Sequence, residues 1–142
     1  MIAVVIIGLL AAIALPTFSR IRAKSQATAI ANNLHQFERA LEQYALESGT
    51  WPAEATAGSV PEGMTSANFP VAVWQAGLKQ GGLYDWDFDV DGIKAGITIV
   101  HDASSNGDSM WAAVDKIVDD GDTSTGRFVL IAPDRFKYTV EQ

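Results

Sequence analysis

Hydrophobic residues change their spacing along this chain, and each spacing predicts a different element. The first 15 residues contain no charged or hydroxyl side chain, and they lead directly into a longer helical pattern. From Ile30 onward, hydrophobic residues recur at intervals of four and three, which places them on one face of a helix. Gly49 and the following Trp51-Pro52 predict where that helix ends. The hydrophobic face consists of Phe18, Ile21, Ile30, Leu34, Phe37, Leu41 and Tyr44.

Pro16 interrupts this helical pattern near its start. A proline lacks the backbone N–H that a helix uses, so we expect a kink or local melting there. The helix then has an apolar half over residues 1–16 and an amphipathic half over residues 17–49. A regular stripe also suits a dimeric coiled coil, but this one covers only about two heptads. We therefore expect the second half to pack against the chain's own globular part. Its solvated flank would carry Glu38, Arg39 and Glu42.

The remainder, residues 50–142, predicts a globular head that contains an antiparallel sheet. Residues 49–70 are rich in Gly, Pro, Ser, Thr and Ala, which is typical of a long surface connection. The segment from Gly92 to His101 alternates in hydrophobicity, so it predicts a strand with one face on a core. That face carries Ile93, Ala95, Ile97 and Ile99.

A short helix and a hairpin are predicted further along the head. Asp108 is a suitable N-cap for a helix that ends at Gly121. Residues 127–132 and 136–140 have the pattern of two strands, and Pro133-Asp134 between them favours a hairpin turn. The hydrophobic side of the helix carries Met110, Trp111, Val114, Ile117 and Val118. The local pattern alone therefore predicts an α+β domain.

Composition and charge narrow the classes of function. The 142 residues suffice for one domain with a modest core. The formal net charge is −7; residues 1–50 hold four basic and three acidic side chains, a net of +1, so residues 51–142 hold −8. A head this acidic repels phosphates, which argues against nucleic-acid binding. The absence of cysteine excludes disulfides and thiolate metal sites.

Two acidic runs are candidate calcium sites, and no other cofactor is indicated. Asp87, Asp89 and Asp91 alternate ahead of Gly92, as ligands do at the opening of a calcium loop. The twelfth position of that loop is Thr98 rather than Glu, and the same alternation fits a strand with its charges in water.

The second run follows the short helix of the head. Asp119, Asp120 and Asp122 lie at its predicted C-terminus, where the helix dipole disfavours negative charge. Bound Ca²⁺, the side chain of Arg127 or simple solvation would each compensate.

Signals for catalysis are weak. Gly107-Asp108-Ser109 and Asp122-Thr123-Ser124 resemble fragments of hydrolase motifs, but the companion motifs are missing. His35 and His101 lie on different predicted elements without metal-ligand spacing. We expect no enzymatic activity.

The apolar N-terminus carries the most specific signal. No basic residue precedes it, and Pro16 followed by Thr17-Phe18 is a poor cleavage site, so it does not fit a secretory signal peptide. The order Gly-Leu-Leu-Ala-Ala-Ile-Ala-Leu-Pro over residues 8–16 resembles the N-terminal helix of type IV pilins and type II secretion pseudopilins. Residues 81–87 and 119–128 also resemble segments of bacterial prepilin-like proteins. The calcium-bearing C-terminal loop of major pseudopilins is not recognisable here.

This resemblance implies a pilin-like α+β fold, with one long N-terminal α-helix packed on a small antiparallel β-sheet. It also implies an N-methylated mature end and a glutamate upstream of Met1, because the family's proline aligns with Pro16. Fifteen helical residues measure roughly 22 Å, short of the ~30 Å hydrocarbon core of a bilayer. We therefore expect the sequence to be that of the mature subunit without its N-terminal tip.

The function implied is that of a structural subunit of a type IV pilus-like filament or a type II secretion pseudopilus. Such a subunit is held in the bacterial inner membrane by one transmembrane helix, with its head in the periplasm, before it joins the filament, which can extend to the cell surface. Its partners would be other pilin or pseudopilin subunits, the prepilin peptidase and the assembly machinery. The alternative is a membrane-tethered periplasmic binding module that forms no filament.

The resemblance also indicates which residues would carry the assembly. The large apolar residues of the first helix half would face lipid or neighbouring subunits. Gly8 and Ala12, at small-xxx-small spacing, would allow close helix approach, and Pro16 would be a flexible point. The large residues are Ile2, Val5, Ile6, Leu9, Leu10 and Ile13.

Overall fold

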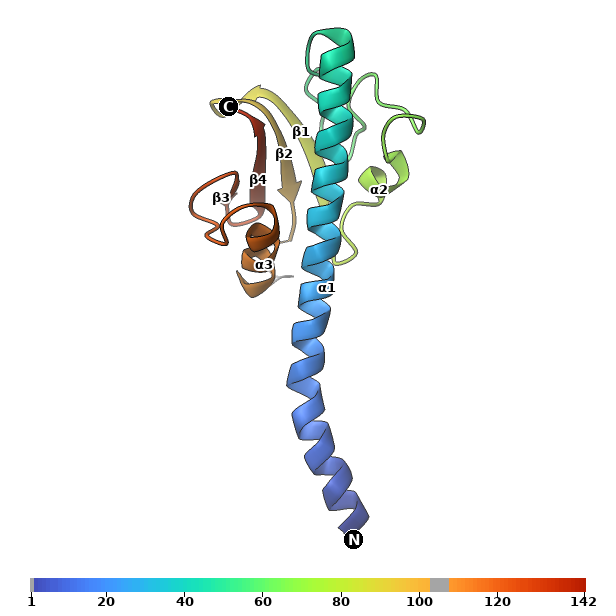
Figure 1. Cartoon of the computed structure of the whole chain (residues 1–142), viewed down its shortest axis with the longest axis vertical. Coiled ribbons are helices and arrows are strands. Elements are labelled where there is room, and N and C mark those ends of the chain that lie inside the picture. The colour runs from blue at the N-terminus through green and yellow to red at the C-terminus, as the bar shows by residue number, and fades with distance from the viewer. Residues whose placement is uncertain (1, 103–107) are drawn as a thin grey trace.

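One helix, α1 (Ile2–Ser48), extends the length of the molecule, and the remaining elements lie beside its C-terminal half (Figure 1). The structure, a computed structural model, describes residues 2–102 and 108–142, and at positions 13–16 and 108 it describes the backbone without the side chains. The N-terminal half of α1 projects away from the head, so the N-terminus lies at the far end of the molecule (Figure 1). The predicted long N-terminal helix is confirmed.

The end of α1 is confirmed and the predicted melting at Pro16 is wrong. Gly49 adopts a positive φ of 78°, and its N–H donates to the carbonyl of Ala45 at 2.9 Å, which closes the last turn. The helix continues through position 16, because a proline removes one backbone donor while the turns on either side remain bonded. The Pro16 side chain lies outside the described residues.

Four antiparallel strands form one sheet in the order β1-β2-β4-β3. They are β1 (Leu83–Val90), β2 (Ile93–Val100), β3 (Phe128–Ala132) and β4 (Arg135–Glu141). The three predicted strands and the Pro133-Asp134 turn are confirmed, since Ala132 pairs with Arg135 across that turn. The small antiparallel sheet beside a long helix confirms the α+β class.

The first strand, β1, confirms the alternative given for the alternating aspartates, a strand in place of a calcium loop. Its partner β2 follows after a two-residue turn, Asp91-Gly92, whose φ angles are 53° and 79°. Two left-handed residues are what a type I′ hairpin requires, and Asp-Gly is among its preferred pairs. Of the segment that imitates the opening of a calcium loop, Asp87 and Asp89 therefore belong to β1, and Asp91-Gly92 form the turn of a β-hairpin.

The core lies between the C-terminal half of α1 and the inner face of the sheet, and it is rich in aromatic rings. Phe37 of α1 contacts Phe69, Trp74 and Tyr84, with ring centroids 5.3, 4.9 and 4.8 Å away. Trp74 belongs to the short helix α2 (Val71–Ala76), which was not predicted, and Tyr84 belongs to β1. One side chain of α1 thus joins three parts of the head.

The connection over residues 49–70 is more than a surface loop. Pro52, Met64 and Phe69 are buried, and the indole N–H of Trp86 donates to the carbonyl of Pro52 at 3.0 Å. The predicted long connection lacks helix and strand and is mostly exposed, and its few buried hydrophobic residues anchor it on the core.

The helix α3 (Asp108–Val118) covers the other end of the sheet, next to α1 (Figure 1). Its residues Met110, Trp111, Val114 and Val118 are buried as predicted, whereas Ile117 is 44% exposed. The ring of Trp111 lies 4.5 Å from that of Phe136 in β4. The predicted N-cap role of the Asp108 side chain lies outside the described residues.

Candidate functional site

The first half of α1 is an apolar helix segment whose described side chains are exposed. Its large hydrophobic side chains between Ile2 and Leu10 are 52–79% exposed. By length and composition α1 contains a candidate membrane span, and none of the side chains described in that span is buried. Uncharged residues continue past Pro16 to Ser19, so the length inferred from the first 15 residues was too short.

The predicted packing residues lie on this projecting half. Ile2, Val5, Ile6, Leu9 and Leu10 are exposed, and so is Ala12. A Cβ added to Gly8 would meet no atom within 4 Å. The side chains of Ile13 and Pro16 lie outside the described residues. This surface is therefore open to lipid or to another helix, and the roles of its residues remain predictions.

The head begins to cover α1 only above its first six turns. Phe18 is 68% exposed and Ile21 is similarly exposed, although both belong to the predicted stripe. Burial begins at Ala27 and continues with Ile30 and Ala31. The second helix half packs on its own head as predicted, but the stripe residues before Ala27 remain largely exposed.

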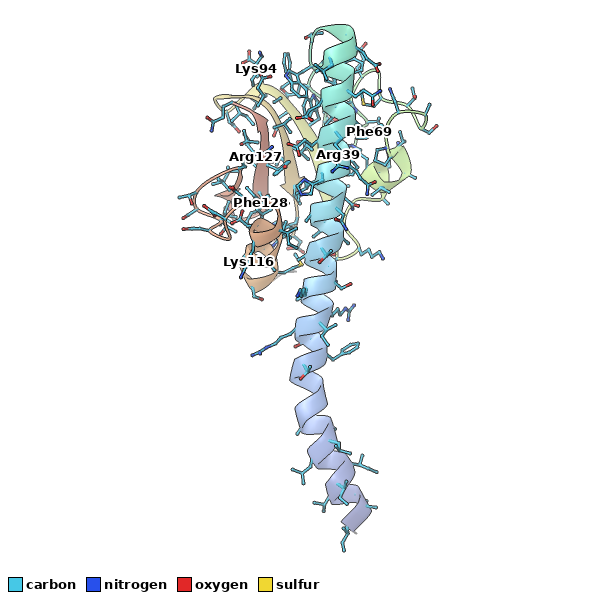
Figure 2. The ribbon with its side chains drawn as sticks, viewed as in Figure 1. Arg39, Phe69, Lys94, Lys116, Arg127 and Phe128 are labelled. Carbon is cyan, nitrogen blue, oxygen red and sulfur yellow. The ribbon has the colours of Figure 1, made fainter. Side chains whose placement is uncertain are left out.

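A basic band separates the apolar half from the head. Arg20, Arg22 and Lys24 are exposed, and they form no ion pair with any residue in the described part of the chain. Arg20 and Lys24 line an open groove of about 670 Å³ between α1 and α3, together with Lys116, which Figure 2 labels. The positive band contrasts with the acidic head above it.

Glu38 is not on a solvated flank, contrary to prediction. Its side chain is only 13% exposed, it pairs with the guanidinium of Arg127, and it accepts a hydrogen bond of 2.8 Å from the hydroxyl of Tyr138. Burial, followed by the hydrogen bond to the carboxylate, raises the pKa of Tyr138. Arg127 lies between the sheet and α1 (Figure 2), so its guanidinium is engaged with α1.

The structure does not bring Asp87, Asp89 and Asp91 together as a metal site. Asp87 is buried and accepts a hydrogen bond from the hydroxyl of Thr98 on β2. Asp89 is exposed, and Asp91 in the turn pairs with the buried ammonium of Lys137 at 3.0 Å. The three carboxylates have different surroundings, because side chains on a strand and in the following turn point in different directions.

The end of α3 does gather carboxylates, but not the predicted set. Asp115, Asp119 and Asp120 each place a carboxylate oxygen within 4.8 Å of the others. Asp122 instead accepts hydrogen bonds at its Oδ1 from the backbone N–H and hydroxyl of Ser124, and these bonds lower its pKa. Asp115 was missed; its position four and five residues before the other two, on a predicted helix, was the available signal.

Arg127 contacts the carboxylates of this loop through its backbone N–H and not through its charged side chain. Its N–H donates to Asp119 Oδ2, while its side chain pairs with Glu38. The backbone N–H of Asp122 donates to Asp120 Oδ1 at 2.8 Å. The loop over residues 119–127 is thus folded back on its own carboxylates.

Comparison with known proteins identifies no relative. No family model, no curated protein and no solved structure matches this chain.

Proposed function

We propose that this chain is a structural subunit of a type IV pilus-like filament or secretion pseudopilus. One observation carries the proposal, namely the apolar half of α1, whose described side chains are exposed and which extends from a folded head. A soluble monomer rarely exposes so large a continuous apolar surface, because covering it with lipid or protein lowers the free energy.

The same helix suits two successive environments. In the bacterial inner membrane its uncharged residues would lie in the bilayer, with the head in the periplasm. In a filament they would pack against the same residues of neighbouring subunits. Gly8 supports this step, since a helix surface with small residues allows a second helix to approach closely.

The absence of cysteine allows a clean test of self-association in membranes. In the Leu9→Cys variant the single thiol lies on the projecting half, whereas in the control Ser66→Cys it lies on an exposed loop of the head. We expect a short bifunctional maleimide to produce dimers of the first variant in membranes and not of the second. Electron microscopy of cells that express the assembly machinery should show filaments that contain the chain.

The alternative function, a membrane-tethered periplasmic binding module that forms no filament, predicts the opposite results. In that case Leu9→Cys would remain monomeric after cross-linking, and no filament would contain the chain, although both variants are inserted in the membrane.

A further inference from the structure

The carboxyl group of Asp115 is buried without a partner. The residue is completely shielded from solvent, and neither of its carboxylate oxygens accepts a hydrogen bond. A buried polar group without a partner is costly, and an ionised one more so. Such a group in a folded protein calls for a compensating ligand or charge.

Negative charges around Asp115 make its ionised form still less favourable. Its carboxylate lies near those of Asp119 and Asp120, with oxygens within 4.8 Å, at the C-terminal end of α3 where the helix dipole is also negative.

We propose that Asp115, Asp119 and Asp120 bind a divalent metal ion, and that the ion is Ca²⁺. The buried carboxylate supplies the inner ligand, and the two exposed ones close the site from the solvent side. A bound ion would coordinate the buried oxygens, which accept no hydrogen bond, and would neutralise the negative charge of the three carboxylates.

The ligand chemistry selects calcium. All three side chains offer carboxylate oxygens, and calcium takes six to eight oxygen ligands at about 2.3–2.6 Å in flexible geometry. The loop over residues 119–127 can supply backbone carbonyls, and water can complete the shell. Zinc would favour nitrogen and sulfur ligands, and neither His nor Cys belongs to this group.

Bound calcium would fasten the end of α3 to the strand that follows. Asp119 already accepts the N–H of Arg127, which immediately precedes β3. An ion on Asp115, Asp119 and Asp120 would therefore link α3, the loop and the start of β3. This inference is independent of the filament proposal, since it concerns only the head.

Thermal unfolding of the full chain in detergent micelles tests the site, with calcium chloride as the ligand and EDTA as the reference. At calcium about 100-fold above the dissociation constant, we expect Tm to rise by roughly 5 to 10 °C. Asp115→Asn should abolish this rise. Asp120→Asn, at an exposed position, should reduce it strongly and serves if the buried substitution prevents folding.

The matched control is Asp89→Asn on the β1–β2 hairpin. Asp89 is exposed and has a φ of 58°, a conformation that Asn adopts readily, so this variant should keep the full rise. An unchanged Tm of the wild-type chain in calcium would overturn the proposal. So would a rise that persists in Asp115→Asn or Asp120→Asn, or one that disappears in Asp89→Asn.

Discussion

Glu38 and Glu42 lie one helical turn apart on α1, yet their surroundings differ completely. Glu42 is exposed, whereas Glu38 is enclosed between Arg127 and Tyr138 of the head. The Arg127 guanidinium also lies 4.8 Å from the centroid of the Tyr138 ring. Glu38 is thus the polar contact that joins α1 to the β4 side of the sheet.

Removing this carboxylate should destabilise the head. We expect Glu38→Ala to lower the free energy of unfolding by about 2 kcal/mol, because Tyr138 loses its acceptor and Arg127 loses its partner. We place the value below that of a fully buried ion pair since the Arg127 side chain is partly exposed. Denaturant unfolding of the full chain in detergent measures it.

The control is Glu42→Ala, which should change stability by no more than about 0.5 kcal/mol. Equal losses in the two variants would mean that the Glu38 contacts do not stabilise the fold.

Both halves of α1 carry large hydrophobic side chains, but of those described the head covers only side chains of the second half. Phe18 and Phe37 both belong to the predicted stripe, but only Phe37 is covered by the head. The reason is geometric, since the sheet, α2 and α3 together are shorter than a 47-residue helix (Figure 1). The head therefore leaves the described side chains of the lower half exposed.

This division predicts unequal effects of the same substitution. Phe37→Ala should cost about 3 to 5 kcal/mol, because it opens a cavity among Phe69, Trp74 and Tyr84. Phe18→Ala should leave the unfolding free energy of the head within about 0.5 kcal/mol of the wild type. Denaturant titration followed by tryptophan fluorescence measures both variants.

A large loss in Phe18→Ala would show that the head also depends on the projecting half.

The molecule as a whole combines a folded acidic head with a projecting apolar helix half that contributes no described side chain to the core of the head. Membrane binding and head stability should therefore be separable. The double variant Leu9→Asp/Leu10→Asp raises the free energy of inserting the helix into a bilayer by roughly 6 to 8 kcal/mol. It should leave the membrane fraction and abolish filaments, while the head unfolds at the same temperature as in the wild type.

Leu46→Asp is the comparison, because Leu46 is 86% exposed at the other end of the same helix. It should stay with the membrane fraction. If Leu9→Asp/Leu10→Asp remained in the membrane, the projecting half of α1 would not be the anchor.

Local pattern was sufficient for the elements whose hydrophobic period is regular. The helix up to Ser48, the strand with Ile97 and Ile99, and the β3–β4 hairpin all follow from periodicity and turn residues. The strand β1 was only an alternative in the sequence, because Asp87, Asp89 and Asp91 ahead of Gly92 fit both an alternating strand and the opening of a calcium loop. Sequence order showed where carboxylates are frequent, but not which ones converge.

Hydrophobic spacing was thus enough to predict the long helix, its apolar and amphipathic halves and the α+β class, because these depend on residues close together in the chain. The tertiary structure decided that Glu38 is enclosed and that Asp115 joins Asp119 and Asp120. It also decided that burial on α1 starts near Ala27. Burial and electrostatic environment depend on distant segments, so a glutamate or aspartate has the same appearance in the sequence whether it faces water or the core.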